Sequence, residues 1–359
     1  MTGSSAVNGL AAVLLATLLP LCQVSGGRAA DQVVDTYRAG TYQALQAKSG
    51  TDTPDDHGGE FGTKMVNSVP VPDGIYEDVV RITFRPSAVS NEQAVCTGTM
   101  MRGQHAVLTA GHCSCGVADS YRFISKETFD QHLDAGQLPN FTLRAIREAV
   151  RFPGFDCTEG ADNAGRDLAL FFVRNLNEEK NEPPPSKTGP LTRVASMHSV
   201  YAAGARQLTA TGYGITQNGT FPDTLERGRI DIGSYFCSQG DFGGTPCVGF
   251  HEFVLGTLGG GSVATPVDTC NGDSGGPVYW YPPAQTDASN GKVFFPPPAL
   301  VGVTSRALAF ADHLPGMLCG GGGVYTAVGH SDVLNWMLSS GVLVRTIGLS
   351  IDLSAAGGQ

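Results

Sequence analysis

The sequence predicts an all-β protein with little helix, and three observations support this expectation. Between about residues 75 and 330, short runs rich in Val, Ile, Leu, Phe and Thr alternate with turn segments rich in Gly, Pro and Asn. The chain has 48 Gly and 21 Pro among 359 residues, which suits many tight turns and few long helices. Eight of its nine cysteines lie in this same region, as expected for a fold held by disulfides in an oxidising compartment.

The first 64 residues differ from this pattern, and we interpret them as two processing segments. Residues 10–21 form an almost wholly apolar run that is too short to span a bilayer comfortably, and small residues follow it at 25–27. We therefore assign residues 1–27 to a signal peptide, whose removal also removes Cys22. Residues 28–64 combine a weak helical period with a stretch rich in Asp, Gly, Thr and Pro, and we interpret them as a propeptide.

The strands of the body are expected at the apolar runs that turn residues separate. A closing amphipathic helix is expected at residues 331–338, with Ser331 as the candidate N-cap, and residues 341–359 form a C-terminal tail. The most evident strand candidates are residues 79–84, 106–108, 168–173, 207–211 and 294–303.

Composition excludes several classes of protein. The chain carries 23 Lys and Arg against 33 Asp and Glu, a net charge of −10, and it has no basic run, so nucleic acid is not an expected partner. No Cys-x-x-Cys pair occurs, so no structural zinc site is expected, and no cofactor is expected. No stretch after the leader resembles a membrane span, so we expect no membrane association once the signal is removed.

The segment with the most potential catalytic groups is residues 268–277, with the sequence DTCNGDSGGP. The Ser274 hydroxyl is a poor nucleophile until a base removes its proton and hydrogen-bond donors stabilise the oxyanion that forms. Glycines around Ser274 allow a sharp turn that points backbone N–H groups at one spot. Such a turn alone is also compatible with an ordinary surface loop, so the chain must supply a base and an orienting acid elsewhere.

Two further motifs supply those groups. His112 follows an apolar run within the sequence TAGHC, and Asp167 begins the strongly apolar run DLALFFV. A lone histidine or a strand-end aspartate is usually structural. Three motifs in the order His112, Asp167 and Ser274, with separations of 55 and 107 residues, are hard to obtain by chance.

With these motifs the chain resembles a trypsin-like serine protease of the chymotrypsin family. The segments GYG at 212–214, VGVTS at 301–305 and GVYT at 323–326 extend the resemblance, which covers about residues 65–340. The resemblance implies two six-stranded antiparallel Greek-key barrels, with the active site in the cleft between them and a short C-terminal helix. It also implies a secreted, extracellular serine endopeptidase that acts through an acyl-enzyme intermediate.

The resemblance assigns roles to individual residues. Ser274 would attack the scissile carbonyl, His112 would accept its proton, and Asp167 would orient His112. The N–H groups of Gly272 and Ser274 would form the oxyanion hole. Asp268, Ser305 and Gly323 would line the primary pocket, where the Asp268 carboxylate would select Arg or Lys before the cut, with Arg favoured by two parallel hydrogen bonds. Arg306 and Ala307 stand where the family usually has Trp and Gly.

Disulfides and an activation step also follow from the resemblance. It implies the pairs Cys96–Cys113, Cys237–Cys247 and Cys270–Cys319, which leaves Cys115 and Cys157 to pair with each other. Cleavage after Lys64 would free the amino group of Met65 to pair with Asp273. The alternative is that Lys64 is an ordinary loop lysine.

Two rival interpretations stay open at this point. One is a protease-like binding protein without activity, although all three triad positions are filled. The other keeps the chemistry but has a pocket of chymotryptic or narrow specificity. In the leading interpretation the protein is a monomer whose partners are protein or peptide substrates and protein inhibitors.

Overall fold

The computed structural model describes most of the body of the chain. The expected signal peptide (1–27) and propeptide (28–64), with Lys64, lie outside the described residues. Within the described part, no helix has the length and apolar character needed to cross a membrane. The structure describes residues 65, 68–72, 75–76, 78–84, 94–101, 106–115, 122–125, 144–162, 165–175, 191–215, 221–222, 224–238, 241–242, 244–256, 267–308 and 319–347.

The first barrel consists of six strands that close in the order β2-β3-β4-β7-β6-β5. Every neighbouring pair in it is antiparallel. Its sequences are rich in residues that pack well on a pleated surface, such as VVRITF in β2. The strands are β2 (Val79–Phe84), β3 (Ala94–Met100), β4 (Ala106–Thr109), β5 (Arg122–Ser125), β6 (Arg144–Arg151) and β7 (Ala169–Asn175).

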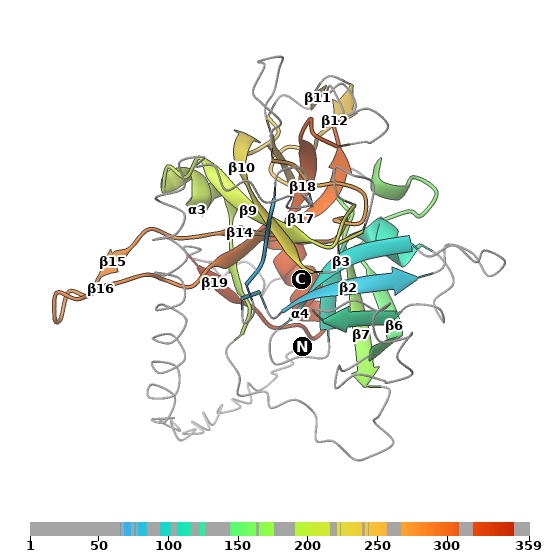
Figure 1. The fold of residues 1–359 in the computed structure, drawn as a ribbon, viewed down its shortest axis with the longest axis horizontal. Helices are drawn as coiled ribbons and strands as arrows, with labels where there is room; N and C mark the ends of the chain where they lie inside the picture. Colours follow the sequence, from blue (N-terminus) through green and yellow to red (C-terminus); the bar gives the residue numbers. More distant parts are fainter. Residues whose placement is uncertain are drawn as a thin grey trace, which may run out of the picture.

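A second ring of six antiparallel strands follows in the sequence and lies beside the first (Figure 1). The strands pair in the order β14-β9-β10-β13-β18-β17, and a pairing between β14 and β17 closes the ring. The prediction of an all-β, two-barrel fold is confirmed. The strands are β9 (Gln207–Gly212), β10 (Glu226–Ser234), β13 (Glu252–Leu255), β14 (Pro277–Trp280), β17 (Ala299–Ala307) and β18 (Gly323–Ala327).

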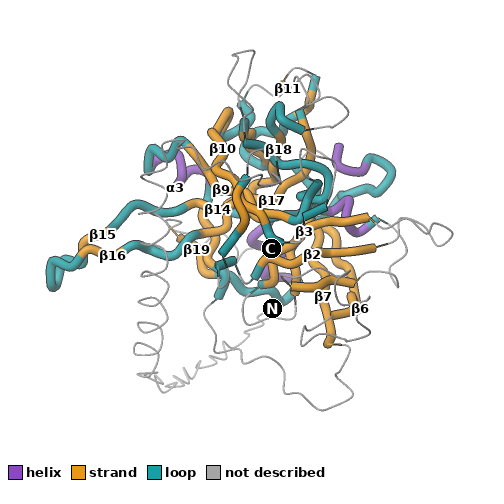
Figure 2. Tube along the Cα trace, in the orientation of Figure 1, coloured by secondary structure: helices purple, strands orange, loops and turns teal. Residues whose placement is uncertain are grey.

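Several short elements lie outside the two barrels, and most of the described secondary structure is strand (Figure 2). β1 (Val69–Pro70) pairs with β10. β8 (Arg193–Ala195) pairs in parallel with β17, and β19 (Arg345–Ile347) pairs in parallel with β8. The C-terminal tail therefore contributes a strand. Two small hairpins complete the sheets, β11 (Asp241–Phe242) with β12 (Thr245–Pro246), and the projecting β15 (Gln285–Thr286) with β16 (Val293–Phe294).

Two expected element boundaries are wrong. Residues 294–303 were expected to form one strand, but β16 ends at Phe294 and β17 begins at Ala299. Pro296, Pro297 and Pro298 lie between them, and proline has no N–H to donate to a sheet. The helix α4 (Ser331–Ser339) is capped by His330 rather than Ser331, because the His330 ring accepts the N–H of Asp332.

Two large cores hold the barrels. One fills the first barrel and extends to α4, where the Trp336 ring meets Phe152 edge-on with centroids 5.3 Å apart. The other fills the second barrel, where the Phe253 and Tyr325 rings stack at 5.5 Å. Because α4 follows the last strand of the second barrel and packs with the first, it fixes the two barrels against each other.

Candidate active site

His112 and Asp167 meet at one end of the first barrel. His112 lies in the short 3-10 helix η1 (Gly111–Ser114) just after β4, and Asp167 lies two residues before β7. The antiparallel pairing of β4 with β7 brings the two segments together. The His112 Nδ1 atom lies 2.9 Å from Asp167 Oδ2, and the His112 backbone N–H donates to Asp167 Oδ1 at 2.8 Å.

Asp167 also receives a hydrogen bond from the second barrel. The Ser305 hydroxyl donates to Asp167 Oδ2 at 2.6 Å, and the Asp167 side chain is fully buried. Ser305 lies where the register between β17 and β18 shifts, and such a bulge redirects a side chain. The Ser305 hydroxyl is thus directed at Asp167, and the expected place of Ser305 in the wall of the primary pocket stays a prediction.

Ser274 lies on a turn that β3 of the first barrel holds in place. The Ser274 carbonyl accepts the N–H of Thr97 at 2.8 Å, and the Thr97 hydroxyl donates to the Gly272 carbonyl at 2.9 Å. Gly272 and Gly275 have φ of +97° and +82°, the left-handed region that side chains disfavour. The turn therefore needs glycine on both sides of Ser274.

The serine turn lies next to the histidine segment. The Cys113 sulfur is 3.7 Å from the Ser274 carbonyl oxygen, and Cys113 directly follows His112. No hydrogen bond joins the Ser274 hydroxyl to the His112 ring in the part of the chain described, and such bonds are often long before a substrate binds. Among the described residues, the N–H groups of Gly272 and Ser274 have no acceptor.

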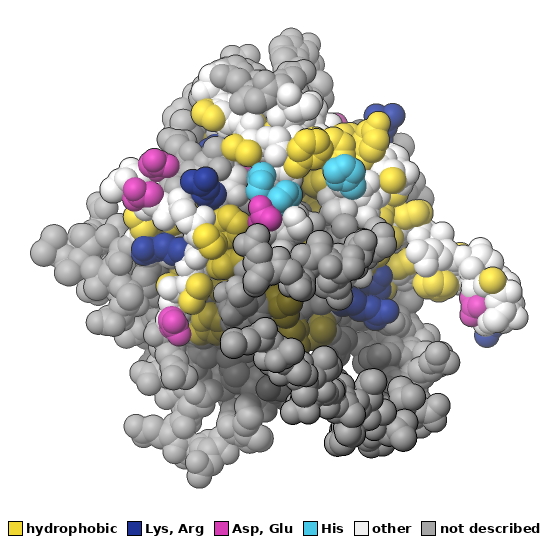
Figure 3. Space-filling view, turned by 180° about the vertical axis from the view of Figure 1, so that it is seen from behind, with side chains coloured by type: hydrophobic (Ala, Val, Ile, Leu, Met, Phe, Trp, Pro, Cys, Tyr) yellow, Lys and Arg dark blue, Asp and Glu magenta, His cyan; other side chains and the backbone are white. Residues whose placement is uncertain are grey.

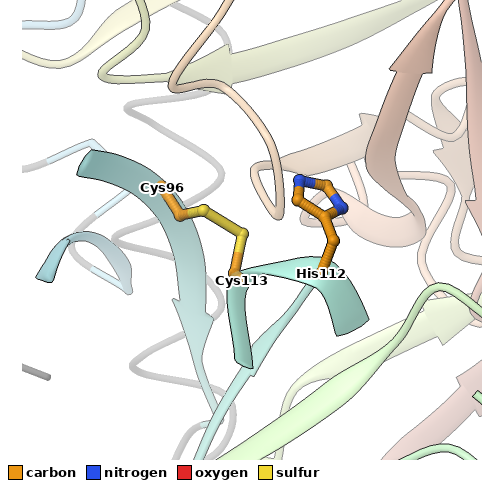
Figure 4. Close-up of side chains that lie close together, drawn as sticks. All are labelled: Cys96, His112 and Cys113. Atoms are coloured by element: carbon orange, nitrogen blue, oxygen red, sulfur yellow. A yellow bond between two sulfur atoms is a disulfide. The ribbon is translucent and has the colours of Figure 1, made fainter. Parts of the chain in front are cut away.

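Disulfides brace this region. Cys96 on β3 is joined to Cys113 beside His112, which ties η1 to the barrel wall (Figure 4). Cys96, His112 and Cys113 also lie close enough to hold a metal ion, but both sulfurs are used in the disulfide. The remaining bonds are Cys115–Cys157, Cys237–Cys247 and Cys270–Cys319, so the structure contains the three pairs that the resemblance implies and the fourth that was left over.

Asp273 is a buried carboxylate whose hydrogen-bond donors, within the described part of the chain, are backbone N–H groups. It accepts the N–H of Gly214 and the N–H of Cys270, each at 2.8 Å. Burial raises the pKa of Asp273 to about 7, and the nearby carboxylates of Asp268 and Glu226 add to the rise. Among the described residues, no cationic side chain forms an ion pair with Asp273. Met65 is fully buried and packs in the core of the second barrel.

Asp268 is also buried, with 1% of its surface exposed. Its Oδ1 accepts the N–H of Thr269 at 2.8 Å, and its Oδ2 accepts the N–H groups of Gly320 and Gly322 at 2.8 and 3.0 Å. Burial raises the pKa of Asp268 to about 6, against the opposing effect of these donors. Gly323 is close-packed, because a Cβ there would lie 3.1 Å from the Arg306 carbonyl.

The structure also contains a buried ion pair that sequence reasoning missed. Arg306 donates to both carboxylate oxygens of Glu252, at 2.7 and 3.1 Å, and also to the Pro246 carbonyl. Glu252 is fully buried and accepts the N–H of Gly165, two residues before Asp167, at 2.7 Å. In the sequence, Arg306 was noticeable as a departure from the family pattern. Its partner Glu252 could have been suspected because it is the one charged residue of the otherwise apolar strand EFVL.

Comparisons with known proteins agree with this geometry. A family model described as Trypsin matches residues 80–328. The snake venom serine protease BthaTL of Bothrops alternatus is 30% identical over 187 residues, which cover 51% of this chain and 68% of that protein. The snake venom serine protease BPA of Bothrops jararaca is 28% identical over 183 residues, 51% of this chain and 62% of that protein. Trypsin iota of Drosophila melanogaster is 35% identical over 98 residues, 26% of this chain and 35% of that protein.

Proposed function

The chain belongs to the trypsin family of serine endopeptidases, and from that premise we propose that it cleaves peptide bonds after Arg or Lys, using Ser274, His112 and Asp167. One observation carries the proposal. The buried Asp167 carboxylate is fixed by the His112 ring, the His112 backbone N–H and the Ser305 hydroxyl. A carboxylate held in this way keeps the proton on Nδ1 of His112 and leaves Nε2 free to act as a base.

The proposed reaction has two stages. His112 Nε2 accepts the Ser274 proton as the serine oxygen attacks the scissile carbonyl carbon, and the N–H groups of Gly272 and Ser274 stabilise the resulting oxyanion. The intermediate collapses when the imidazolium passes its proton to the leaving amine, which departs and leaves an ester on Ser274. A water molecule then repeats the attack with His112 as base, releasing the acid and restoring the Ser274 hydroxyl.

The specificity part of the proposal rests on Asp268. A buried carboxylate six positions before the nucleophile would pair with a cationic side chain, and an apolar side chain would leave it without a cation. A carboxylate offers about four lone-pair sites, and the N–H groups of Thr269, Gly320 and Gly322 already occupy three of them, with the Gly321 backbone also contributing. An incoming cation must therefore share the carboxylate with these donors, which suits the point charge of Lys better than the two-pronged contact of Arg, and we propose this order in place of the Arg preference expected from the sequence.

We extend the proposal to activation and secretion. Cleavage after Lys64 would give Met65 a free ammonium that pairs with Asp273, a buried acid that lacks a cation among the described residues. Removal of residues 1–27 would precede this step during export, in keeping with relatives named as venom proteases. N-terminal sequencing of active enzyme from the culture medium should begin at Met65, and a start well before it would contradict this activation step.

The catalytic proposal is tested by labelling with a fluorophosphonate probe. Wild-type enzyme should be labelled at Ser274, and Ser274→Ala should lose both labelling and turnover, by on the order of 10⁴- to 10⁶-fold. Ser289→Ala is the matched control, because Ser289 is exposed on the projecting hairpin, and it should keep both properties. Turnover that survives in Ser274→Ala would overturn the mechanism, whereas an unlabelled, inactive wild type would favour a protease-like binding protein.

A further inference from the structure

A histidine cluster lies beside the segment that leads to Asp167, because a Cβ at Gly165 would lie 2.9 Å from the His251 Cβ. On the face shown in Figure 3, histidine side chains gather next to an acidic side chain. His251 directly precedes β13, His330 caps α4, and Asp332 lies in the first turn of that helix. One potential ligand atom from each residue lies within 4.8 Å of the other two. The imidazole rings of His251 and His330 have centroids only 3.8 Å apart.

The backbone fixes this arrangement. The N–H of Ala327, the last residue of β18, donates to the His251 carbonyl at 2.8 Å, and Glu252 is paired with Thr326 in the sheet. The chain reaches His330 only three residues after Ala327, so the strand register places the two histidines at one edge. The side chains themselves keep some freedom, since Asp332 is 61% exposed and His330 is 22% exposed.

We propose that His251, His330 and Asp332 form a binding site for Zn²⁺. Neutral imidazole nitrogen and carboxylate oxygen are ordinary zinc ligands, and three protein ligands leave a fourth position for water. Zinc bonds of about 2.0–2.2 Å place tetrahedral ligand atoms roughly 3.4 Å apart. His330 Nδ1 lies 3.8 Å from Asp332 Oδ2, so small rotations bring both toward one ion, and zinc would then replace the Asp332 N–H as the partner of Nδ1.

The N-cap of α4 explains the position of His330 but not the whole cluster. His330 Nδ1 accepts the Asp332 N–H over a long distance of 3.3 Å, and a helix cap does not require a second histidine stacked on the first. Zinc would join the start of β13 to the start of α4, two segments far apart in the sequence.

Metal binding can be measured without any assay of activity. The full chain would be titrated with Zn²⁺ in competition with a fluorescent zinc indicator. A second titration would use Co²⁺, whose visible absorption reports a four-coordinate site of nitrogen and oxygen ligands. We expect one equivalent bound by this cluster. His251→Gln and Asp332→Asn should each weaken it at least about 10- to 100-fold, since even residues that only orient ligands cost that much.

The control variant is His198→Gln, because His198 is an exposed histidine on α3 (Met197–Ala202) and lies outside the cluster. It should leave the affinity and the cobalt spectrum unchanged. Asp332→Asn keeps the helix cap of His330, so a loss of binding in this variant is not a loss of fold, which far-ultraviolet circular dichroism would verify. The proposal is wrong if wild-type protein binds no zinc, or if both cluster variants bind it as tightly as His198→Gln does.

Discussion

Replacing Arg306 by Met should destabilise the protein strongly, because the change removes one half of a buried ion pair. The Arg306 side chain is 6% exposed and the Glu252 side chain is fully buried. Without Arg306, the donors left to Glu252 among the described residues are the N–H groups of Gly165 and Val248, and its negative charge stays out of water. Breaking a buried pair from one side costs about 3–5 kcal/mol, a large share of a total stability of about 5–15 kcal/mol.

The measurement is the free energy of unfolding in urea, made in the Ser274→Ala background so that the protein does not digest itself. The double variant Glu252→Gln/Arg306→Met removes both charges and is the matched control. It should be more stable than Arg306→Met alone, since no buried charge is left uncompensated. Unfolding free energies for Arg306→Met within about 1 kcal/mol of the parent would refute the view that this pair secures the segment before Asp167.

Three other outcomes are expected. The uncut chain should lose stability as the pH rises from about 4 to about 7, because the folded state raises the pKa of Asp273 to about 7 and so holds its proton longer than the unfolded state does. Asp273→Asn should flatten that slope in pH-dependent urea unfolding, and an unchanged slope would show that Asp273 is not its source. Asp268→Ser should lower turnover of peptides with Lys or Arg before the cut by orders of magnitude while Ser274 still reacts with a small acylating probe; equal wild-type cleavage after Phe would refute the pocket role. The same peptide series should show Lys cleaved at least as well as Arg, and a strong Arg preference would mean that the backbone donors leave Asp268 when substrate binds.

Sequence and structure contributed different parts of the candidate site. The nucleophile turn could be identified from residues near Ser274, because glycines that take positive φ and a serine between them are a local signal. His112 and Asp167 were recognisable because each borders an apolar strand. The late start of β17 was less accessible, since the apolar pattern of residues 294–303 concealed the effect of three consecutive prolines.

By itself, the sequence determined what neighbouring residues decide: the strand-rich fold class, the turn around Ser274 and the three motifs that place the chain in its family. Only the tertiary structure decided which distant groups share a buried space. Glu252 meets Arg306 across 54 positions, Asp268 meets Gly322 across 54, and His251 meets His330 at the edge of the second barrel. The physical reason is that these contacts depend on the register between paired strands, which the closure of the whole barrel sets and no local pattern encodes.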